Sequence, residues 1–358
     1  MSNTPVRVAM LGTGFIAEFR AQVYARLQGV EVVAVLGRDA EKTRAFASRT
    51  GIAHPAVSWD QLMSGPAFDA VDLCLPNNRH LEYGLLAAQA GKHILCEKPL
   101  GMTEAEGQQM LAAAEKAGII HAYGENMIYA PDFREILDIV AAGTIGKPLW
   151  VRGREAHFGP HSPWFWKRAE SGGGSLMDMG CHLIAVFNML LGETPTSVLC
   201  HAPTLHHDTD CDDISLALLQ YPGGTLGQCE ASWIQRGGMQ VTLEISGSEG
   251  MVTYDRSGLS QPIKVFARNQ VQRYFSEKVE HDRGWLFPTV DEYWRYGYYD
   301  QIRHFVDCIA SGSRPKVTFA DGVVVNRIMD AAYASAKSGT WHPIGHPIGH
   351  PIGQAIKA

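Results

Sequence analysis

The chain has 358 residues, of which 46% are hydrophobic and 19% charged, and its formal net charge is −6 at pH 7. This length suits two domains, and the composition excludes a disordered chain. The acidic balance provides no basic face for nucleic acid. There is no run of about 18 apolar residues, and the N-terminus does not resemble a signal peptide, so we expect a cytoplasmic protein without a membrane span. The seven cysteines, an odd number without a C-x-x-C pair, are interpreted as reduced, buried thiols.

The first third of the chain alternates short apolar runs with helical patterns. Expected strands are 6–11, 30–36, 70–75, 93–96 and 119–123, and expected helices are 15–28, 39–50, 79–90 and 103–117. Strands that alternate with helices in this way indicate a parallel sheet covered on both faces, which is an α/β fold. We place this doubly wound domain at residues 1–124.

The pattern changes near residue 148. Strands are expected at 149–157, 197–201, 214–221, 225–233, 240–247 and 251–254, and helices at 175–191, 292–311 and 321–338. A run of strands without helices between them indicates a mostly antiparallel sheet, so residues 125–341 are predicted to form an α+β domain. The closing helices can pack back on the first domain. Three copies of His-Pro-Ile-Gly predict a loose, low-complexity tail at 342–358.

A glycine-rich turn joins the first expected strand to the first expected helix. It reads G-x-G-x-x-A and comprises Gly12, Thr13, Gly14, Phe15, Ile16 and Ala17. The first glycine permits a tight turn, the second lets the backbone approach a pyrophosphate, and the alanine allows the helix to pack closely. Because the helix N-terminus also attracts phosphate, residues 12–16 are predicted to bind a dinucleotide.

The choice of dinucleotide depends on the end of the second strand. Sites for NAD usually carry an acidic residue there, but this chain has Gly37 followed by Arg38. An arginine can pair with a 2′-phosphate, so the pattern favours NADP, and NAD remains the alternative. The adjacent Asp39 is interpreted as the N-cap of the next helix.

Two further motifs carry candidate chemistry. Glu97-Lys98-Pro99 follows a strand at the carboxyl edge of the parallel sheet, where such sheets bind ligands. Asp178 and His182 are four residues apart in an expected helix and therefore project from one face. The bond between Lys98 and Pro99 can be cis, as X-Pro bonds allow.

The glycine turn, Glu97-Lys98-Pro99, the Asp178-x-x-x-His182 helix and the antiparallel second half together resemble the Gfo/Idh/MocA family of oxidoreductases over residues 6 to about 340. The resemblance implies an N-terminal Rossmann domain and a C-terminal domain with a large open sheet that mediates dimers or tetramers. It also implies a Lys–Asp–His set beside the nicotinamide, formed here by Lys98, Asp178 and His182.

This set suits the oxidation of an alcohol, in which hydride and proton leave together. His182 can accept the hydroxyl proton near neutral pH. Asp178 can orient that imidazole or hold a neighbouring hydroxyl. Lys98 supplies positive charge where alkoxide character develops, and with a lowered pKa it can join the proton relay.

Other residues around these motifs are candidate ligand contacts. Further expected cofactor contacts are Pro76, Asn77, His80, Glu97 and Lys98. Expected substrate contacts are Lys98, Asn126, Tyr129, Arg154, His157, Trp166, Asp178 and His182. Hydrogen-bond donors beside aromatic side chains are typical of polyol sites, which favours a sugar, glycoside or cyclitol substrate. Glu155, His157 and His161 have no defined ligand geometry, so no metal is predicted.

The sequence therefore predicts an NAD(P)-dependent dehydrogenase or reductase acting on a secondary alcohol of a small polyhydroxylated substrate. A redox-assisted glycoside-cleaving enzyme with tightly bound NAD is an alternative. A dinucleotide-sensing regulator without activity is a second one, although such a protein is expected to lose Lys98 or the Asp178–His182 pair.

Overall fold

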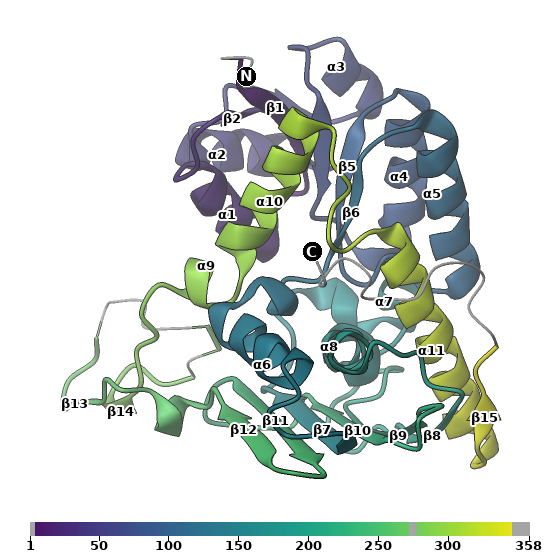
Figure 1. Cartoon of the computed structure of the whole chain (residues 1–358). Helices are drawn as coiled ribbons and strands as arrows, with labels where there is room; N and C mark the ends of the chain where they lie inside the picture. The colour runs from purple at the N-terminus through teal and green to yellow at the C-terminus, as the bar shows by residue number, and fades with distance from the viewer. Residues whose placement is uncertain (1–3, 272–276, 279, 346–358) are drawn as a thin grey trace. The chain divides into compact units, whose positions relative to one another are not determined.

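The computed structural model describes residues 4–271, 277–278 and 280–345 (Figure 1). The chain folds into two compact units, one made of residues 1–130 and 296–326 and the other of residues 131–295 and 327–358. The predicted division at residue 124 differs from these units because residues 125–130 and 296–326 belong to the first of them.

The first unit alternates strands and helices. Its elements are β1 (Val6–Leu11), α1 (Phe15–Tyr24), β2 (Val30–Leu36), α2 (Ala40–Thr50), β3 (His54–Ala56), α3 (Trp59–Met63), β4 (Ala70–Leu73), η1 (Asn77–Arg79), α4 (His80–Gln89), β5 (His93–Glu97), α5 (Glu104–Ala117), β6 (His121–Gly124), η2 (Met127–Tyr129), α10 (Tyr298–Ser311) and the start of α11 (Phe319–Ser338). The short elements β3 and α3 and the turn η2 were not expected from the sequence.

The strands of the first unit form a parallel sheet in the order β3-β2-β1-β4-β5-β6. This order confirms the doubly wound Rossmann arrangement, whose direction reverses between β1 and β4. In the register of the sheet, Leu11 lies beside Leu36 and Leu73, and Leu73 lies beside Cys96. The carboxyl ends of these strands, and the loops that follow them, therefore share one edge.

Local capping explains two of the helix starts. Asp39 accepts a hydrogen bond from the Lys42 N–H, which confirms it as the predicted N-cap of α2, and Thr103 accepts one from the Glu106 N–H at the start of α5. The Glu106 carboxylate accepts the N–H of Met102. The first helix ends at Tyr24, four residues before its predicted end.

The second unit is built on a mixed sheet. Its elements are α6 (Pro131–Ala141), β7 (Pro148–Ala156), η3 (Pro163–Trp166), α7 (Arg168–Ser171), the π-helical turn η4 (Leu176–Gly180), α8 (Cys181–Leu191), β8 (Ser197–His201), β9 (Ile214–Gln220), β10 (Leu226–Ser232), β11 (Gln240–Gly247), β12 (Met251–Asp255), η5 (Gly258–Ser260), β13 (Val265–Ala267), β14 (Gly284–Leu286), α9 (Glu292–Arg295), the remainder of α11 and β15 (His342–Pro343). The sheet order is β12-β11-β7-β10-β9-β8-β15. Only the β7–β10 pairing within this order is parallel, which confirms the mostly antiparallel prediction.

One face of this sheet packs against α8, which Figure 1 shows end-on above the strands. A side chain at Gly153 in β7 would collide with Leu183 and Phe187 of α8, so the glycine permits close packing. Because side chains alternate along a strand, Glu155 shares the face of Gly153, whereas Arg152 and Arg154 lie on the opposite face.

The single helix predicted at 292–311 is interrupted. Helix α9 ends at Arg295, and α10 begins at Tyr298 after Gly297, whose φ is +86°. A Cβ at Gly297 would overlap the backbone of Asn126 and Ala130. This positive φ and close approach explain the break.

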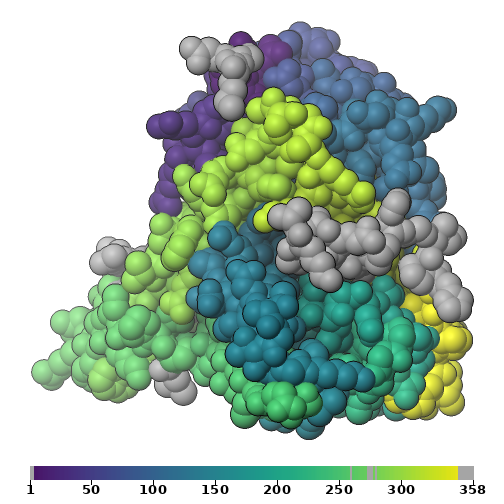
Figure 2. Space-filling view, in the orientation of Figure 1, coloured from purple at the N-terminus to yellow at the C-terminus, as the bar shows by residue number. Residues whose placement is uncertain are grey.

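A long excursion between β12 and α9 carries the hairpin of β13 and β14. Phe266 and Trp285 lie opposite each other in this hairpin, with ring centroids 5.4 Å apart, and both are more than 60% exposed. The hairpin, labelled β13 and β14 in Figure 1, belongs to the green lobe on the left of Figure 2.

The start of the predicted loose tail is ordered, which corrects the prediction for residues 342–345. His342 and Pro343 form β15 beside β8, and Ile344 is buried. The remaining His-Pro-Ile-Gly repeats lie outside the described residues.

One helical stretch in the described part of the chain, Arg168–Leu191, is long and apolar enough by composition to span a membrane. However, 89% of its apolar window is buried inside the protein. Core helices pass the same test, so this stretch is weak evidence for a span.

Candidate active site

The glycine turn lies at the switch point of the parallel sheet, between β1 and α1. Gly12 has a φ of +121°, and a Cβ there would overlap the Cys74 carbonyl at the end of β4. Gly14 is the N-cap of α1, and a Cβ at this position would meet no atom within 4 Å. Gly12 is thus required by the fold itself, whereas Gly14 leaves open space before the first turn of the helix. That space fits a pyrophosphate.

The end of β2 carries a glycine, and a side chain there would require the neighbouring threonine side chains to move. A Cβ on Gly37 would overlap Thr43 Oγ1 and approach Thr13 Cγ2 within 2.9 Å. The next residue, Arg38, is exposed, and Asp39 is engaged as the cap of α2. Arg38 is therefore the charged side chain available here for the ribose end of a dinucleotide.

His80 connects two loops at the carboxyl edge. Its Nδ1 lies 2.9 Å from the Pro99 carbonyl oxygen and its Nε2 lies 3.0 Å from the Leu75 carbonyl oxygen. The ring is fully buried, and burial lowers the pKa of His80. The predicted cofactor contact His80 therefore links the loop after β4 to the loop after β5. Asn77, which begins η1 in the first of these loops, is also buried.

Glu97 points into the protein and holds the backbone of its neighbour. Its Oε2 accepts the Lys98 N–H at 3.1 Å, and its Oε1 lies 3.0 Å from Arg20 Nη1. The Lys98–Pro99 peptide bond is cis, as the sequence allowed. Asn326, on α11, completes the loop because it accepts the Gly101 N–H and donates to the Gly101 carbonyl.

Arg20 is the centre of a buried ion cluster that the sequence analysis missed. Its guanidinium donates to Asp72 Oδ1 and to Gln301 Oε1, each at 2.8 Å, and Tyr24 donates its hydroxyl to Asp72 Oδ2. Burial raises the pKa of Asp72, and Arg20 opposes that effect. Two features of the sequence could have indicated this cluster. They are an aspartate inside the apolar strand Ala70–Leu73 and an arginine on the buried face of α1.

Asn126 and Tyr129, which are predicted substrate contacts, are buried beside residues 296–304, where the chain re-enters the first unit. Asn126 Nδ2 donates to the Tyr296 carbonyl at 2.7 Å. Tyr129 packs against His304 with ring centroids 5.7 Å apart, and burial raises its pKa. Both residues therefore stabilise the packing of the first unit.

In the second unit, a glycine-rich turn leads into the element that carries Asp178 and His182. Asp178 lies in the π-helical turn η4 and His182 in the first turn of α8, and both are buried. The Asp178 N–H donates to the Gly174 carbonyl at 2.9 Å. A single π turn within a helix is frequent at functional sites.

Two residues that directly follow strands of the sheet lie next to the Asp178 carboxylate. The Trp233 indole, just past the end of β10, donates to Asp178 Oδ2 at 3.1 Å, and His157 Nε2 lies 3.7 Å from the same oxygen. Burial lowers the pKa of His157 to about 3, and Lys278 adds to this effect. His157 is thus a neutral imidazole beside the carboxylate. The predicted contact Trp166 packs edge-to-face on Trp233, with ring centroids 5.1 Å apart.

Arg154 does not join this group. It lies on the sheet face opposite α8, where it pairs with Glu230 at 2.6 Å and donates to Gln235 at 2.9 Å. Strand alternation turns Arg154 away from the face that carries Asp178, and its role as a substrate contact stays a prediction.

The excursion after β12 contributes residues that the sequence analysis did not select. Lys278 donates to the Gly159 carbonyl, and Glu277 lies 3.0 Å from His161 Nε2. Their sequence neighbourhood carries no motif, so only the tertiary fold identifies them. Within the described residues, no group of three or more His, Cys, Asp or Glu side chains is arranged to hold a metal ion. All seven cysteines lie in the described part and are buried and free, as predicted.

A glycine turn at the switch point of a doubly wound sheet and a buried carboxylate–imidazole group on an antiparallel domain define the class of dinucleotide-dependent oxidoreductases. Residues 6–125 match the model of an oxidoreductase family with an NAD-binding Rossmann fold, and residues 133–253 match the GFO/IDH/MocA C-terminal domain. The chain belongs to the Gfo/Idh/MocA oxidoreductase family, and it is an NAD(P)-dependent oxidoreductase.

Individual relatives cover almost the whole chain. It is 29% identical to 1,5-anhydro-D-fructose reductase from Ensifer adhaerens, over 88% of this chain and 92% of that protein. The structure of GenD2 from gentamicin A biosynthesis in complex with NAD has a TM-score of 0.91 at 29% identity, covering 96% and 97% of the two chains. Levoglucosan dehydrogenase in complex with NADH and levoglucosan has a TM-score of 0.81 at 26% identity, covering 96% and 100%.

Proposed function

We propose that this enzyme transfers a hydride between NAD(P) and a secondary alcohol carbon of a sugar, glycoside or cyclitol. The observation that carries the proposal is the buried group around Asp178, in which a carboxylate, an imidazole and an indole N–H adjoin the aromatic side chain of Trp166. Polar hydrogen-bonding groups beside aromatic rings suit a ligand with hydroxyls and C–H faces. Two of the relatives named above, 1,5-anhydro-D-fructose reductase and levoglucosan dehydrogenase bound to levoglucosan, agree with this substrate class.

The bound dinucleotide supplies the hydride acceptor or donor. In the proposed reaction His182 takes the hydroxyl proton, and Asp178 orients the reacting group. Lys98 offers positive charge to the developing alkoxide, while Glu97 holds the Lys98 backbone in place. Placing Lys98, Asp178 and His182 in one reaction is part of the proposal.

The experiment is a panel of sugars, glycosides and inositols assayed with each cofactor through the absorbance of the reduced nicotinamide. On a substrate found in this way, His182→Ala is expected to lower kcat by about 10²–10⁴-fold, the range for loss of a general base. His201→Ala, at an exposed histidine on β8, is the matched control. A His182→Ala enzyme with unchanged kcat would exclude the proposed base. Release of an aglycone without net cofactor turnover would instead support redox-assisted glycoside cleavage.

We further propose a preference for NADP over NAD, which rests on Arg38 and on the glycine, in place of an acidic residue, at position 37. The relatives crystallised with NAD or NADH support use of NAD(H) as well. Arg38→Ala is expected to lower kcat/KM for NADP by about tenfold and to leave kcat/KM for NAD nearly unchanged, because only NADP has a 2′-phosphate. An equal decrease in kcat/KM for NADP and for NAD would contradict the proposed preference for NADP.

We also propose a homodimer or homotetramer that forms through the open face of the second unit's sheet. This face exposes a group of large apolar side chains, namely Trp150, Leu216, Leu218 and Leu226. An exposed apolar patch of this kind is typical of subunit interfaces. Light scattering after size-exclusion chromatography is expected to give a multiple of 39.2 kDa, and Leu218→Lys is expected to shift the mass toward the monomer. A wild-type monomer at micromolar concentration would contradict this proposal.

A further inference from the structure

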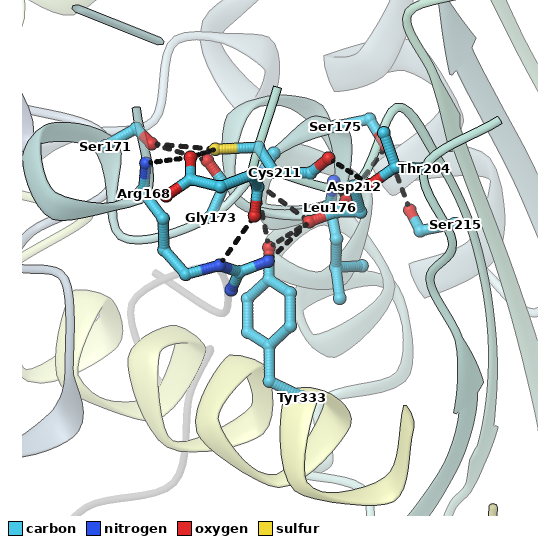
Figure 3. Close-up of polar contacts among 12 residues, drawn as sticks. Arg168, Ser171, Gly173, Ser175, Leu176, Thr204, Cys211, Asp212, Ser215 and Tyr333 are labelled. Carbon is cyan, nitrogen blue, oxygen red and sulfur yellow. Dashed lines mark hydrogen bonds and ion pairs between the residues drawn. The ribbon is translucent and has the colours of Figure 1, made fainter. Parts of the chain in front are cut away.

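The carboxylate of Asp212 contacts the glycine-rich turn that precedes Asp178 (Figure 3). It accepts two backbone hydrogen bonds, from the Gly174 N–H to Oδ1 and from the Leu176 N–H to Oδ2, each at 2.8 Å. Asp212 is only 1% exposed, and it follows these donors by 38 and 36 residues in the sequence. A remote segment therefore binds the start of the helical element.

Further contacts fix the carboxylate itself. Ser175 donates its hydroxyl to Oδ2 at 3.1 Å, and Tyr333, on α11, donates its hydroxyl to Oδ1 at 2.9 Å. The Ser175 N–H donates to the Asp212 main-chain carbonyl at 2.8 Å, and a Cβ on Gly174 would overlap the Asp212 backbone. Arg168 approaches Oδ1 at 4.0 Å. Both carboxylate oxygens are thus engaged, and the turn rests directly on Asp212.

The turn continues without interruption into the residues of the proposed chemistry. Leu176 begins η4, Asp178 lies two residues further on, and His182 follows in the first turn of α8. The first N–H groups of a helix have no partner within the helix, and a carboxylate satisfies them and opposes the positive end of the helix dipole. Asp212 performs the role of an N-cap, supplied from another part of the chain.

We propose that Asp212 is a positioning residue for Asp178 and His182, acting through the backbone N–H groups of Gly174 and Leu176. The proposal rests on the proposed function of that pair. An asparagine cannot replace Asp212, because one of its two terminal atoms is an NH₂ group that would face a backbone N–H donor. Asp212→Asn therefore removes at least one bond and shifts the turn while it retains the size of the side chain.

The test compares Asp212→Asn with Asp210→Asn. Asp210 is exposed and accepts the Arg168 N–H at 2.8 Å, so it caps α7 rather than the element that carries Asp178. On a substrate found with the panel above, Asp212→Asn is expected to lower kcat by about 10–10²-fold, the usual result of misplacing a catalytic group by about 1 Å. NADH affinity, followed by fluorescence, is expected to stay at the wild-type value, and Asp210→Asn is expected to leave kcat unchanged.

A second readout needs no substrate. The Trp233 indole N–H donates to Asp178, so its ¹⁵N–¹H signal reports the position of that carboxylate. Trp233→Phe assigns the signal among the eight tryptophans, and Asp178→Asn gives the signal without the carboxylate. Asp212→Asn is expected to move the Trp233 signal, whereas Asp210→Asn is expected to leave it in place.

Tyr333→Phe separates positioning from stability. It removes one donor to Asp212 and the weaker contact of the Gly174 N–H with the Tyr333 hydroxyl at 3.2 Å, and it keeps the two backbone bonds to the carboxylate, so kcat is expected to fall by less than about threefold even where Tm decreases. An Asp212→Asn enzyme that is folded, with wild-type kcat and an unmoved Trp233 signal, would overturn the proposal. If Asp178→Asn and His182→Ala also kept their kcat, the proposed function would fall with it. If those two lost kcat, only the role of Asp212 would be refuted.

Discussion

Trp233 and Asp178 are 55 residues apart in sequence, yet the indole Nε1 of Trp233 lies 3.1 Å from Asp178 Oδ2 and donates a hydrogen bond to it. The tryptophan is fully buried and follows β10, whereas the aspartate lies in the π-helical turn above the sheet. This bond ties the helix to the strands at the residue on which the proposed chemistry depends.

Trp233→Phe keeps most of the ring volume and removes the donor. Because the buried Asp178 oxygen then loses a partner, the free energy of unfolding is expected to fall by about 1–3 kcal/mol, and kcat to fall with it. Urea unfolding and steady-state kinetics measure the two effects. Trp285→Phe, at the exposed hairpin, is the matched control and is expected to change stability by less than about 0.5 kcal/mol. Equal effects of the two substitutions would contradict the prediction.

The two glycines of the dinucleotide turn are expected to differ when each is replaced by alanine. Gly14→Ala meets no protein atom, so its stability should stay close to wild type while the Kd for NADH rises about tenfold or more, because the methyl group occupies the space for the pyrophosphate. Gly12→Ala clashes with the Cys74 carbonyl at a positive φ, so it should destabilise the fold itself. Thermal unfolding and NADH titration distinguish them. A Gly14→Ala protein with wild-type NADH affinity would refute the assignment of this turn.

The buried Arg20 is expected to contribute far more to stability than an exposed arginine. Arg20→Met leaves Asp72 and Glu97 without their cation, so we expect a loss of about 3–5 kcal/mol in the free energy of unfolding. Arg7→Met removes a similar pair with Asp69 at the surface, and its expected cost is about 0–1 kcal/mol. Denaturant unfolding of both variants at pH 7 provides the comparison. Similar losses would show that the buried cluster tolerates uncompensated charge.

His157 predicts a loss of stability in acid. Burial lowers its pKa from 6.5 to about 3, so between these values the unfolded chain binds a proton that the folded chain does not. The contribution of His157 to the free energy of unfolding is therefore complete above pH 6.5. It decreases as the pH falls toward 3, by about 1.4 kcal/mol per pH unit. His157→Gln should reduce this slope in unfolding experiments between pH 7 and 4.5. His121, whose pKa burial lowers to about 4, contributes in the same direction and remains in the variant.

His201→Gln, at an exposed position on β8, is the control for this experiment and should keep the wild-type slope. If His157→Gln and wild type lose stability equally between pH 7 and 4.5, His157 is not held neutral by the fold.

Short-range patterns predicted much of this architecture correctly. The alternation of strands and helices, the caps at Asp39 and Thr103 and the glycine turn are local features whose physical causes lie within a few residues. The break at Gly297 was missed because its cause is the approach of the Asn126 and Ala130 backbone, which lies far away in sequence. The face of the sheet on which Arg154 lies has a related origin, since it depends on where α8 packs.

The sequence by itself determined the class of fold, the dinucleotide turn and the candidates Lys98, Asp178 and His182, because motifs and periodicity are encoded in neighbouring residues. Only the tertiary structure decided which partners contact these residues and their neighbours. Arg20 pairs with Glu97, Trp233 donates a hydrogen bond to Asp178, and Asp212 accepts hydrogen bonds from the turn before Asp178. Burial makes such long-range contacts necessary, since a charged or polar group removed from water requires a partner, and folding alone determines which residue supplies it.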